Sequence, residues 1–324
     1  MRILSLALFI LLGCFQAFGC SDIMKPYELE CKAQDRFQSL STEFKTFSIT
    51  ITDLKGFKIP KALGKISYFS AKNDLLNHSE ITLSKNKEWP NWNNGQKFVK
   101  KLSPIYLEFN DIMKLHKILF GSINLLDQSS DTGKIRTNNG ETNPKLKMSC
   151  SEKVLNDKIL KTLSDYDLTS IEGYPLLSLK NINVCKDSKY NSADLYFYKG
   201  ASMRIELSRW MIDLNDMIAR YENGNAPTNI SPYHYFSDMR RWFLAIRPFN
   251  SSNEQVVDAL IDYSAKRLQL PSLPLIDSVN SIFLTVAENR DHTVKQLQEN
   301  LTFFEGCLFE TKMKLISSEC QALK

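Results

Sequence analysis

The sequence has few of the residues and motifs on which most catalytic and metal-binding sites depend. Its 324 residues include only four histidines, and it contains no G-x-S-x-G, H-E-x-x-H or Walker-type motif and no Cys-x-x-Cys pair. With only 12 glycines and 11 prolines, it is neither collagen-like nor rich in disordered linkers. What is present is an ordinary globular composition, 43% hydrophobic and 24% charged, long enough for one large domain or two smaller ones.

The net charge and the spacing of metal-ligand residue types also limit which partners and cofactors we expect. The formal net charge is only +5 and no nucleic-acid-binding module is recognisable, so we expect no nucleic-acid partner. No cluster of His, Cys or acidic residues has the spacing of a metal site, and we expect neither a metal nor another cofactor.

The first 19 residues are typical of an export signal. An apolar run from Ile3 to Leu12 follows a single basic residue and is too short to span a membrane stably. Two cleavage routes are open: a lipobox-like stretch would lipidate Cys14 and attach the protein to a membrane, whereas Ala17–Gly19 suits ordinary signal peptidase. We therefore expect an exported protein, either periplasmic, an outer-membrane lipoprotein or extracellular.

The cysteines left after export form an even set unless Cys20 itself is lipidated. Such a set in an oxidising compartment predicts up to three disulfides. Nearness in the sequence favours pairing in chain order, although six cysteines allow 15 pairings. The cysteines are Cys20, Cys31, Cys150, Cys185, Cys307 and Cys320.

Hydrophobic periodicity divides the remaining chain into a short mixed region and a longer helical one. Residues 20–105 combine helical runs with strand-like alternation at Phe47–Thr52 and a turn-rich stretch at Trp89–Gly95, which predicts a small α+β region. Beyond it, helical spacing dominates. We predict helices within Ser103–Leu126, Leu155–Leu163, Ala201–Tyr221, Ser231–Ile246, Asn253–Leu268 and Asp277–Leu323.

Four stretches form a recognisable pattern in their order. They are LHKILFG with TGKIRTNNG (Leu115–Gly121 and Thr132–Gly140), LSRWMIDLN (Leu207–Asn215), SPYHYFSDMRRWFLAIRPF (Ser231–Phe249) and ALIDYSAKRLQLPSLP (Ala259–Pro274). Together they resemble the helices and the target-docking flap of the Fic family, which has the Fido fold. The resemblance implies a mainly α, Fido-like helical domain at 106–275 with a small flap hairpin. A small α+β region at 20–105 would precede this domain, and a helical extension at 276–324 would follow it.

The family's catalytic motif is H-P-F-x-[DE]-G-N-G-R-x-x-R, and this chain departs from it at nearly every chemical position. The family histidine accepts a proton from the target hydroxyl, whereas the Arg247 guanidinium stays protonated and has no acceptor atom. Ser251 replaces the metal-binding acid, and Gln255 and Asp258 replace the two phosphate-binding arginines. The resemblance therefore implies a degenerate motif, for which we expect no catalytic residue. The corresponding residues are Arg247, Pro248, Phe249, Asn250, Ser251, Ser252, Asn253, Glu254, Gln255, Val256, Val257 and Asp258.

The start of the helix after the motif is predicted to be closed to phosphate. Ser251 with Glu254, and Ser252 with Gln255, match the capping box, in which side chains bond the first amides of a helix. Glu254 also places a carboxylate where a phosphate would bind, with Asp258 one turn further on. At ~4 Å, two such charges repel by ~4 kcal/mol near a protein surface.

Other candidate residues are few. Arg247, Asn253 and His234 are candidates for a remaining ligand pocket, and His116, on an apolar helix, is expected to be partly buried rather than to act as a base. The family's flap holds an extended protein segment by strand addition, a role that does not need the catalytic histidine. The corresponding flap residues are Lys134, Ile135, Arg136 and Thr137.

Three functions stay open on the sequence. We favour an exported, disulfide-stabilised Fic-like protein that has lost AMP transfer and binds a protein or envelope ligand. The second is a divergent Fido transferase, similar to AvrB-like proteins, that uses a nucleotide-sugar or other nucleotide to modify a protein hydroxyl. There Arg247 would clamp a diphosphate, and His234 or a distant acid would act as base. The third is an exported helical protein whose Fic likeness is accidental.

Overall fold

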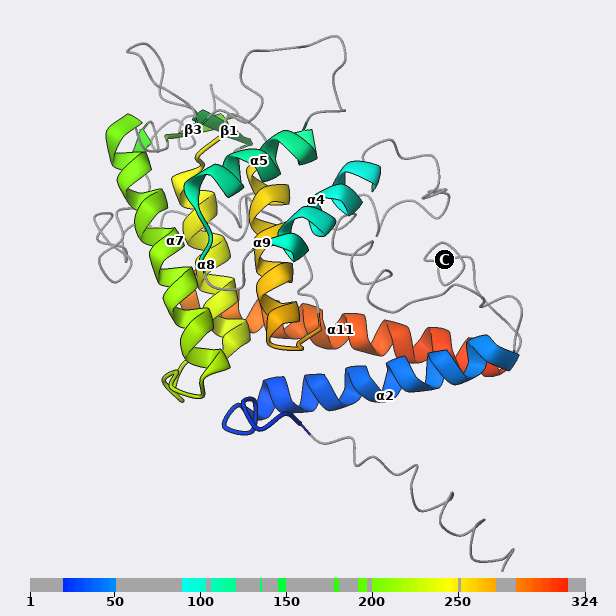
Figure 1. Cartoon of the computed structure of the whole chain (residues 1–324). Helices are drawn as coiled ribbons and strands as arrows, with labels where there is room; N and C mark the ends of the chain where they lie inside the picture. Colours follow the sequence, from blue (N-terminus) through cyan, green and yellow to red (C-terminus); the bar gives the residue numbers. More distant parts are fainter. Residues whose placement is uncertain are drawn as a thin grey trace, which may run out of the picture.

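The computed structural model of the chain is mainly helical, as the sequence predicts (Figure 1). It describes residues 20–50, 89–102, 106–120, 135, 145–149, 178–180, 192–196, 200–249, 252–271 and 284–313. The helices in these ranges are α2 (Glu28–Thr50), α4 (Trp89–Lys101), α5 (Phe109–Phe120), α7 (Gly200–Glu222), α8 (Pro232–Ile246), α9 (Asn253–Arg267) and α11 (Val286–Lys312). The strands β1 (Lys145–Ser149), β2 (Ser178–Lys180) and β3 (Ser192–Tyr196) form an antiparallel sheet in the order β1-β3-β2. None of the described helices is both long and apolar enough to cross a membrane.

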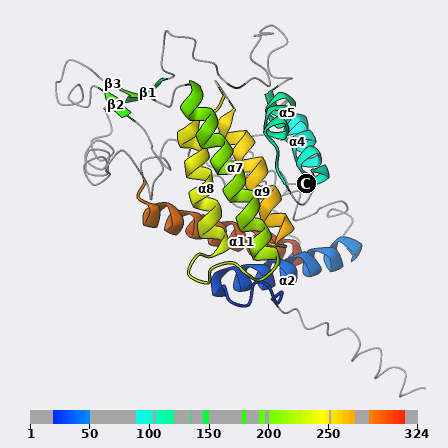
Figure 2. The same cartoon turned by 60° about the vertical axis from the view of Figure 1, so that its left-hand side comes forward.

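Helix α8 packs between α7 and α9 (Figures 1 and 2). The Ser231 hydroxyl caps its start by accepting a hydrogen bond from the His234 amide at 3.4 Å. Of its 15 residues 13 are buried, so this helix is covered on all sides. On α7, the Trp210 ring lies 4.9 Å from that of Phe243, and Trp210 Nε1 donates a 2.8 Å hydrogen bond to the backbone of α8. These contacts fix α7 against α8.

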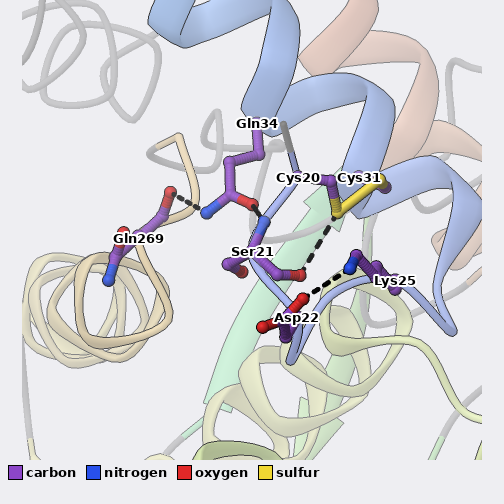
Figure 3. Close-up of a disulfide and its surroundings, with 7 residues drawn as sticks. All are labelled: Cys20, Ser21, Asp22, Lys25, Cys31, Gln34 and Gln269. Atoms are coloured by element: carbon purple, nitrogen blue, oxygen red, sulfur yellow. Dashed lines mark hydrogen bonds and ion pairs between the residues drawn. A yellow bond between two sulfur atoms is a disulfide. The ribbon is translucent and has the colours of Figure 1, made fainter. Parts of the chain in front are cut away.

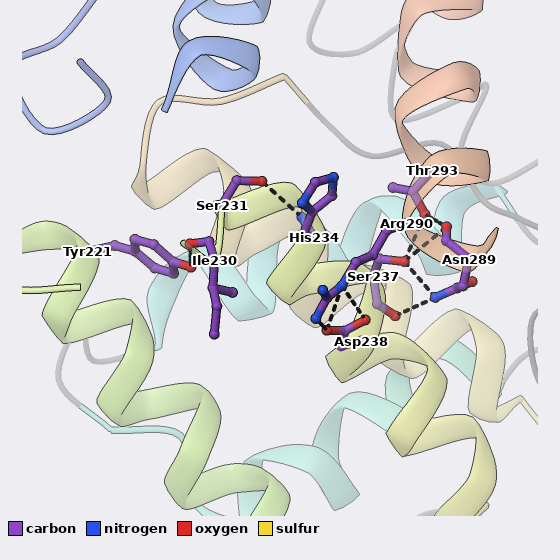
Figure 4. A network of polar contacts seen from close by, with 9 residues as sticks. All are labelled: Tyr221, Ile230, Ser231, His234, Ser237, Asp238, Asn289, Arg290 and Thr293. Atoms are coloured by element: carbon purple, nitrogen blue, oxygen red, sulfur yellow. Dashed lines mark hydrogen bonds and ion pairs between the residues drawn. The ribbon is translucent and has the colours of Figure 1, made fainter. Parts of the chain in front are cut away.

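Helices α2 and α11 pack side by side across one end of this group (Figure 1). A buried polar network, drawn in Figure 4, fastens α11 to α8. In it, Asn289 Nδ2 donates to the Ser237 hydroxyl at 2.6 Å, and the Thr293 hydroxyl donates to the same oxygen at 2.9 Å. The two terminal helices therefore share one hydrophobic core with α7, α8 and α9.

A disulfide between Cys20 and Cys31 ties the start of the described chain to α2, which confirms that predicted pair (Figure 3). Beside it, Gln34 Oε1 accepts a 2.9 Å hydrogen bond from the Ser21 amide, and Gln34 Nε2 donates to the Gln269 carbonyl at 3.2 Å. The two hydrogen bonds satisfy the oxygen and the nitrogen of the fully buried Gln34 side-chain amide. Cys307 is also disulfide-bonded. The remaining cysteines with predicted pairs lie outside the described residues: Cys150, Cys185 and Cys320.

Two predictions for the N-terminal region are wrong. The stretch predicted as a strand from Phe47 continues α2 as far as Thr50. At that point α2 is already several turns long, and extending a helix is easier than starting a new element. The stretch predicted as a loop, Trp89–Gly95, is the first half of α4, with its proline in the first turn, where a helix tolerates proline. Gly95 marks the contact of α4 with α5, because a Cβ there would lie 2.6 Å from Leu119 Cδ2.

The other helix predictions agree with the structure where it describes them. Helices α7, α8 and α9 match the predicted segments closely, and α5 and α11 occupy the inner parts of theirs. The predicted helix Leu155–Leu163 lies outside the described residues. Both α4 and α5 pack against α9, and α5 thereby comes to lie beside the loop that joins α8 to α9.

Candidate functional site at the loop between α8 and α9

Helix α8 ends where the backbone becomes left-handed. Arg247 has φ 46° and ψ 63°, and its amide closes the last turn on the Phe243 carbonyl at 2.9 Å. Pro248 follows and has no amide hydrogen with which to continue the helix. The chain therefore leaves the axis of α8 at Arg247, the residue that stands in the place of the family's histidine.

Asn253 closes the loop that follows. Its Oδ1 accepts a hydrogen bond from the Phe249 amide at 2.9 Å, and its Nδ2 donates to the Phe249 carbonyl at 2.8 Å. Both residues are completely buried. The side-chain amide thus satisfies two backbone groups that no helix or strand serves here. Phe249 and Asn253, which the chain shares with the motif, act as the structural frame of the loop.

Phe249 also packs on a histidine, although not the one expected near this loop. The rings of Phe249 and His116 are stacked, with centroids 3.9 Å apart and planes 7° from parallel. His116, on α5, is 2% exposed and so more completely buried than predicted. His234 lies near the start of α8, by Ser231 (Figure 4), and a rise of 1.5 Å per residue places it about 20 Å from Arg247. The predicted grouping of Arg247, Asn253 and His234 therefore does not hold.

The predicted capping of α9 is also corrected. Ser252 is the N-cap residue, but its backbone is left-handed, with φ 56° and ψ 22°, and its side chain makes no capping hydrogen bond. An N-cap side chain reaches the first-turn amides from an extended backbone, which Ser252 lacks. The motif has glycine at this position, the residue best suited to positive φ. Ser251, the other predicted cap, lies outside the described residues.

Two arginines offset the carboxylates at the start of α9. Glu254 Oε1 lies 3.7 Å from Arg247 Nη1, and Asp258 Oδ1 accepts a 2.6 Å hydrogen bond from Arg240 Nε. The Arg240 and Asp258 side chains are only 7% and 2% exposed. Burial raises the pKa of Asp258 to about 6, although Arg240 lowers it; Glu254 and Asp262 raise it further. The predicted repulsion between Glu254 and Asp258 is present but is opposed by both arginines.

Sequence patterns missed two contacts of this site. Arg240 lies inside a helix whose periodicity predicts burial, and a buried guanidinium needs an acid partner, so this signal was available. The partner itself, Asp258, is 18 residues away on another helix, and no local pattern identifies it. The stack of His116 on Phe249 joins segments still further apart and has no sequence signal.

The predicted flap is almost entirely outside the described residues. Ile135 alone is described; it is 5% exposed and belongs to the hydrophobic core. Lys134, Arg136 and Thr137 lie outside, so docking by this segment stays a prediction. Within the described ranges, no group of three or more His, Cys, Asp or Glu side chains is placed to hold a metal ion.

The described side chains of the loop make structural contacts. A guanidinium does not accept a proton at working pH, so Arg247 is not a general base. Asn253 engages Phe249 through both its oxygen and its nitrogen. Glu254 lies 3.7 Å from Arg247, so the two charges offset each other.

The chain was compared with protein families, curated proteins and solved structures. No protein-family model matches the chain, and no curated protein matches it. Among solved structures, it is similar to a Fic domain-containing signaling protein from Bacteroides thetaiotaomicron, with a TM-score of 0.40 and 12% sequence identity. The likeness covers 88% of this chain and 96% of that one. A likeness at these values does not show the family, and membership of the Fic family stays a prediction.

Proposed function

We propose that this chain is an exported, Fic-like protein that has lost AMP transfer and acts by binding a protein or envelope ligand. The Arg247–Glu254 ion pair, at 3.7 Å, carries the proposal. It puts a group without a proton acceptor in the place of the family's base, and a carboxylate in the first turn of α9. Taken alone, Glu254 would repel a phosphate bound ~4 Å away by ~4 kcal/mol, and Arg247, which would otherwise attract that phosphate, is paired with Glu254.

The second acidic position supports the same conclusion. Asp258 stands where the motif has an arginine, and it is held by Arg240 inside the core. This position therefore lacks the positive charge that the motif arginine would offer to a nucleotide, and its carboxylate instead pairs with Arg240. The loop keeps its shape through the bonds of Asn253 to Phe249, so its frame does not depend on a bound nucleotide.

The proposal that the protein is exported rests on its N-terminal residues. An apolar stretch of the kind that directs export precedes Cys20. The Cys20–Cys31 disulfide supports it, because disulfides persist in oxidising compartments. Lipidation of Cys14 would add membrane attachment, and mass spectrometry of the protein isolated from its own cells distinguishes that form from a chain beginning at Cys20.

Calorimetric titration with magnesium-ATP tests the loss of chemistry. We expect no saturable binding by the wild-type protein, and no mass gain in candidate proteins incubated with it and ATP or nucleotide-sugars. Glu254→Gln is the matched variant, since it removes the charge and keeps the shape. Binding that appears only in this variant would identify Glu254 as the block. Saturable binding or a mass gain with the wild-type protein would instead favour a divergent transferase.

The binding role is tested in cells that export the protein. A photo-crosslinking residue in place of Arg136, on the predicted flap, should give a defined adduct with one partner. The same residue in place of Asn223, an exposed position just after α7, is the control. Equal adducts at the two positions, or none at either, would argue against ligand docking at the flap.

A further inference from the structure

The outer face of α7 carries an apolar stripe that the rest of the described chain leaves exposed. Ile205 is 54% exposed and Ile212 is 68% exposed. The two lie seven residues apart, which places them on one face of the helix, two turns from each other. The inner face carries buried residues such as Trp210, and Figure 2 shows α7 in front of α8 and α9. Single exposed isoleucines are ordinary, and two in line on one helix face form a short apolar stripe.

Charged residues flank this stripe in a particular order. Arg209 precedes Ile212 by three residues and Asp216 follows it by four, and their side chains are 60% and 55% exposed. Arg220, 51% exposed, lies one turn beyond. At about 100° per residue, these residues and both isoleucines fall within about 80° of arc. The face therefore reads, along the helix, apolar, positive, apolar, negative, positive.

We propose that this face of α7 binds the same face of a second copy of the chain, with the two helices antiparallel. A two-fold axis between Ile212 and Asp213 brings the two Ile212 side chains together. Arg209 of each copy then faces Asp216 of the other, and Ile205 lies against the aliphatic stem of Arg220. A parallel pairing would set arginine against arginine, so the charge order selects the antiparallel arrangement.

The internal ion pairs of α7 leave this pairing possible. Arg209 bonds Glu206 through Nη1 at 2.7 Å, and Asp216 Oδ2 receives Arg220 Nε at 2.8 Å. A guanidinium has five donor hydrogens and a carboxylate has two oxygens. Both groups therefore have capacity for a bond across the axis.

The segment that precedes α5 is bonded to α7 beside the stripe. Asn215, on the turn after Ile212, binds the backbone of Leu107 by two hydrogen bonds, of 2.7 and 3.1 Å. These bonds hold the segment before α5 along α7, and its Tyr106 is 67% exposed.

The proposed contact between two α7 helices is small, so we expect the dimer to be weak. From Ile205 to Arg220 the helix is about 24 Å long. One helix pair of this length covers less than the roughly 1,200 Å² of a stable complex. We expect a reversible dimer with a micromolar dissociation constant, weakened by salt because its ion pairs are exposed.

Sedimentation velocity of the purified full chain over a range of concentrations tests the proposal. The wild-type protein should show a concentration-dependent dimer, and Ile212→Glu should weaken it at least tenfold. Arg209→Glu and Asp216→Arg should each weaken it as well, and the double variant should restore it because the swapped charges match again. Phe309→Glu, on α11 and 64% exposed in the native protein, is the control and should leave the dimer unchanged.

Crosslinking tests the position of the axis independently. Ile212→Cys should form a covalent dimer on mild oxidation, whereas Ile205→Cys, far from its own copy in the antiparallel arrangement, should not. Circular dichroism confirms that each variant is folded. A wild-type protein that is monomeric at all concentrations would overturn the proposal. So would a dimer insensitive to Ile212→Glu, one lost in Phe309→Glu, or a double charge swap that fails to restore association.

Discussion

Replacing Asn253 by alanine removes the two hydrogen bonds that hold the loop between α8 and α9. The lost partners are the amide and the carbonyl of Phe249, at 2.9 and 2.8 Å. Both residues are 0% exposed, so bulk water does not replace the missing side chain. A buried polar group without a partner costs about 1–3 kcal/mol. Allowing for relaxation of the loop, we predict that Asn253→Ala lowers the free energy of unfolding by about 2–4 kcal/mol.

Urea unfolding followed by far-ultraviolet circular dichroism measures this loss. With a slope of about 3 kcal/mol per molar urea, the midpoint should fall by about 1 M. Asn223→Ala, at an exposed position, is the matched control and should change the free energy by less than about 0.5 kcal/mol. Asn253→Asp adds a specific signature, because its carboxyl regains a donor hydrogen at low pH. The free energy of unfolding that Asn253→Asp loses relative to wild type should therefore become smaller as the pH falls.

A small effect would contradict this prediction. If Asn253→Ala cost less than about 0.5 kcal/mol with an unchanged slope, other groups would be serving the backbone of Phe249. The loop would then not be framed by Asn253. An Asn253→Asp loss that is independent of pH would contradict the paired donor and acceptor roles of the side chain.

Ser252→Gly should raise the free energy of unfolding by about 1 kcal/mol, because glycine adopts the φ of 56° without strain; thermal unfolding measures this, with Ser252→Ala as the control that should give no gain. Burial raises the pKa of Asp258 from 3.8 to about 6, so the folded state binds a proton more readily than the unfolded state. As the pH falls from 7 toward 4, the free energy of unfolding of the wild-type protein should therefore rise by up to about 3 kcal/mol relative to that of Asp258→Asn. A difference between the two free energies that does not change with pH would contradict the prediction. Replacing both Cys20 and Cys31 by serine should cost about 3 kcal/mol in urea unfolding, since the disulfide spans a separation of 11 residues, and an unchanged midpoint would show that it adds no stability.

Local sequence is enough to predict the central helices and the absence of a proton acceptor at Arg247. The apolar spacing that predicted α7, α8 and α9 is a local property, and so is the start of α8 at Ser231 and Pro232. That a guanidinium accepts no proton follows from its covalent structure in any fold.

Which side chains contact one another depends on the packing of the whole fold. The bonds of Asn253 to Phe249 need a loop shape that is set by left-handed backbone at Arg247 and Ser252. Because the backbone of Ser252 is left-handed, its side chain does not make the capping hydrogen bond that the sequence predicts. The pair of Arg240 with Asp258 and the position of Gly95 against α5 depend on helices that pack side by side. Residue spacing along one helix says which side is buried, but the partner on that side is set by how separate helices pack, and that packing is a property of the whole chain.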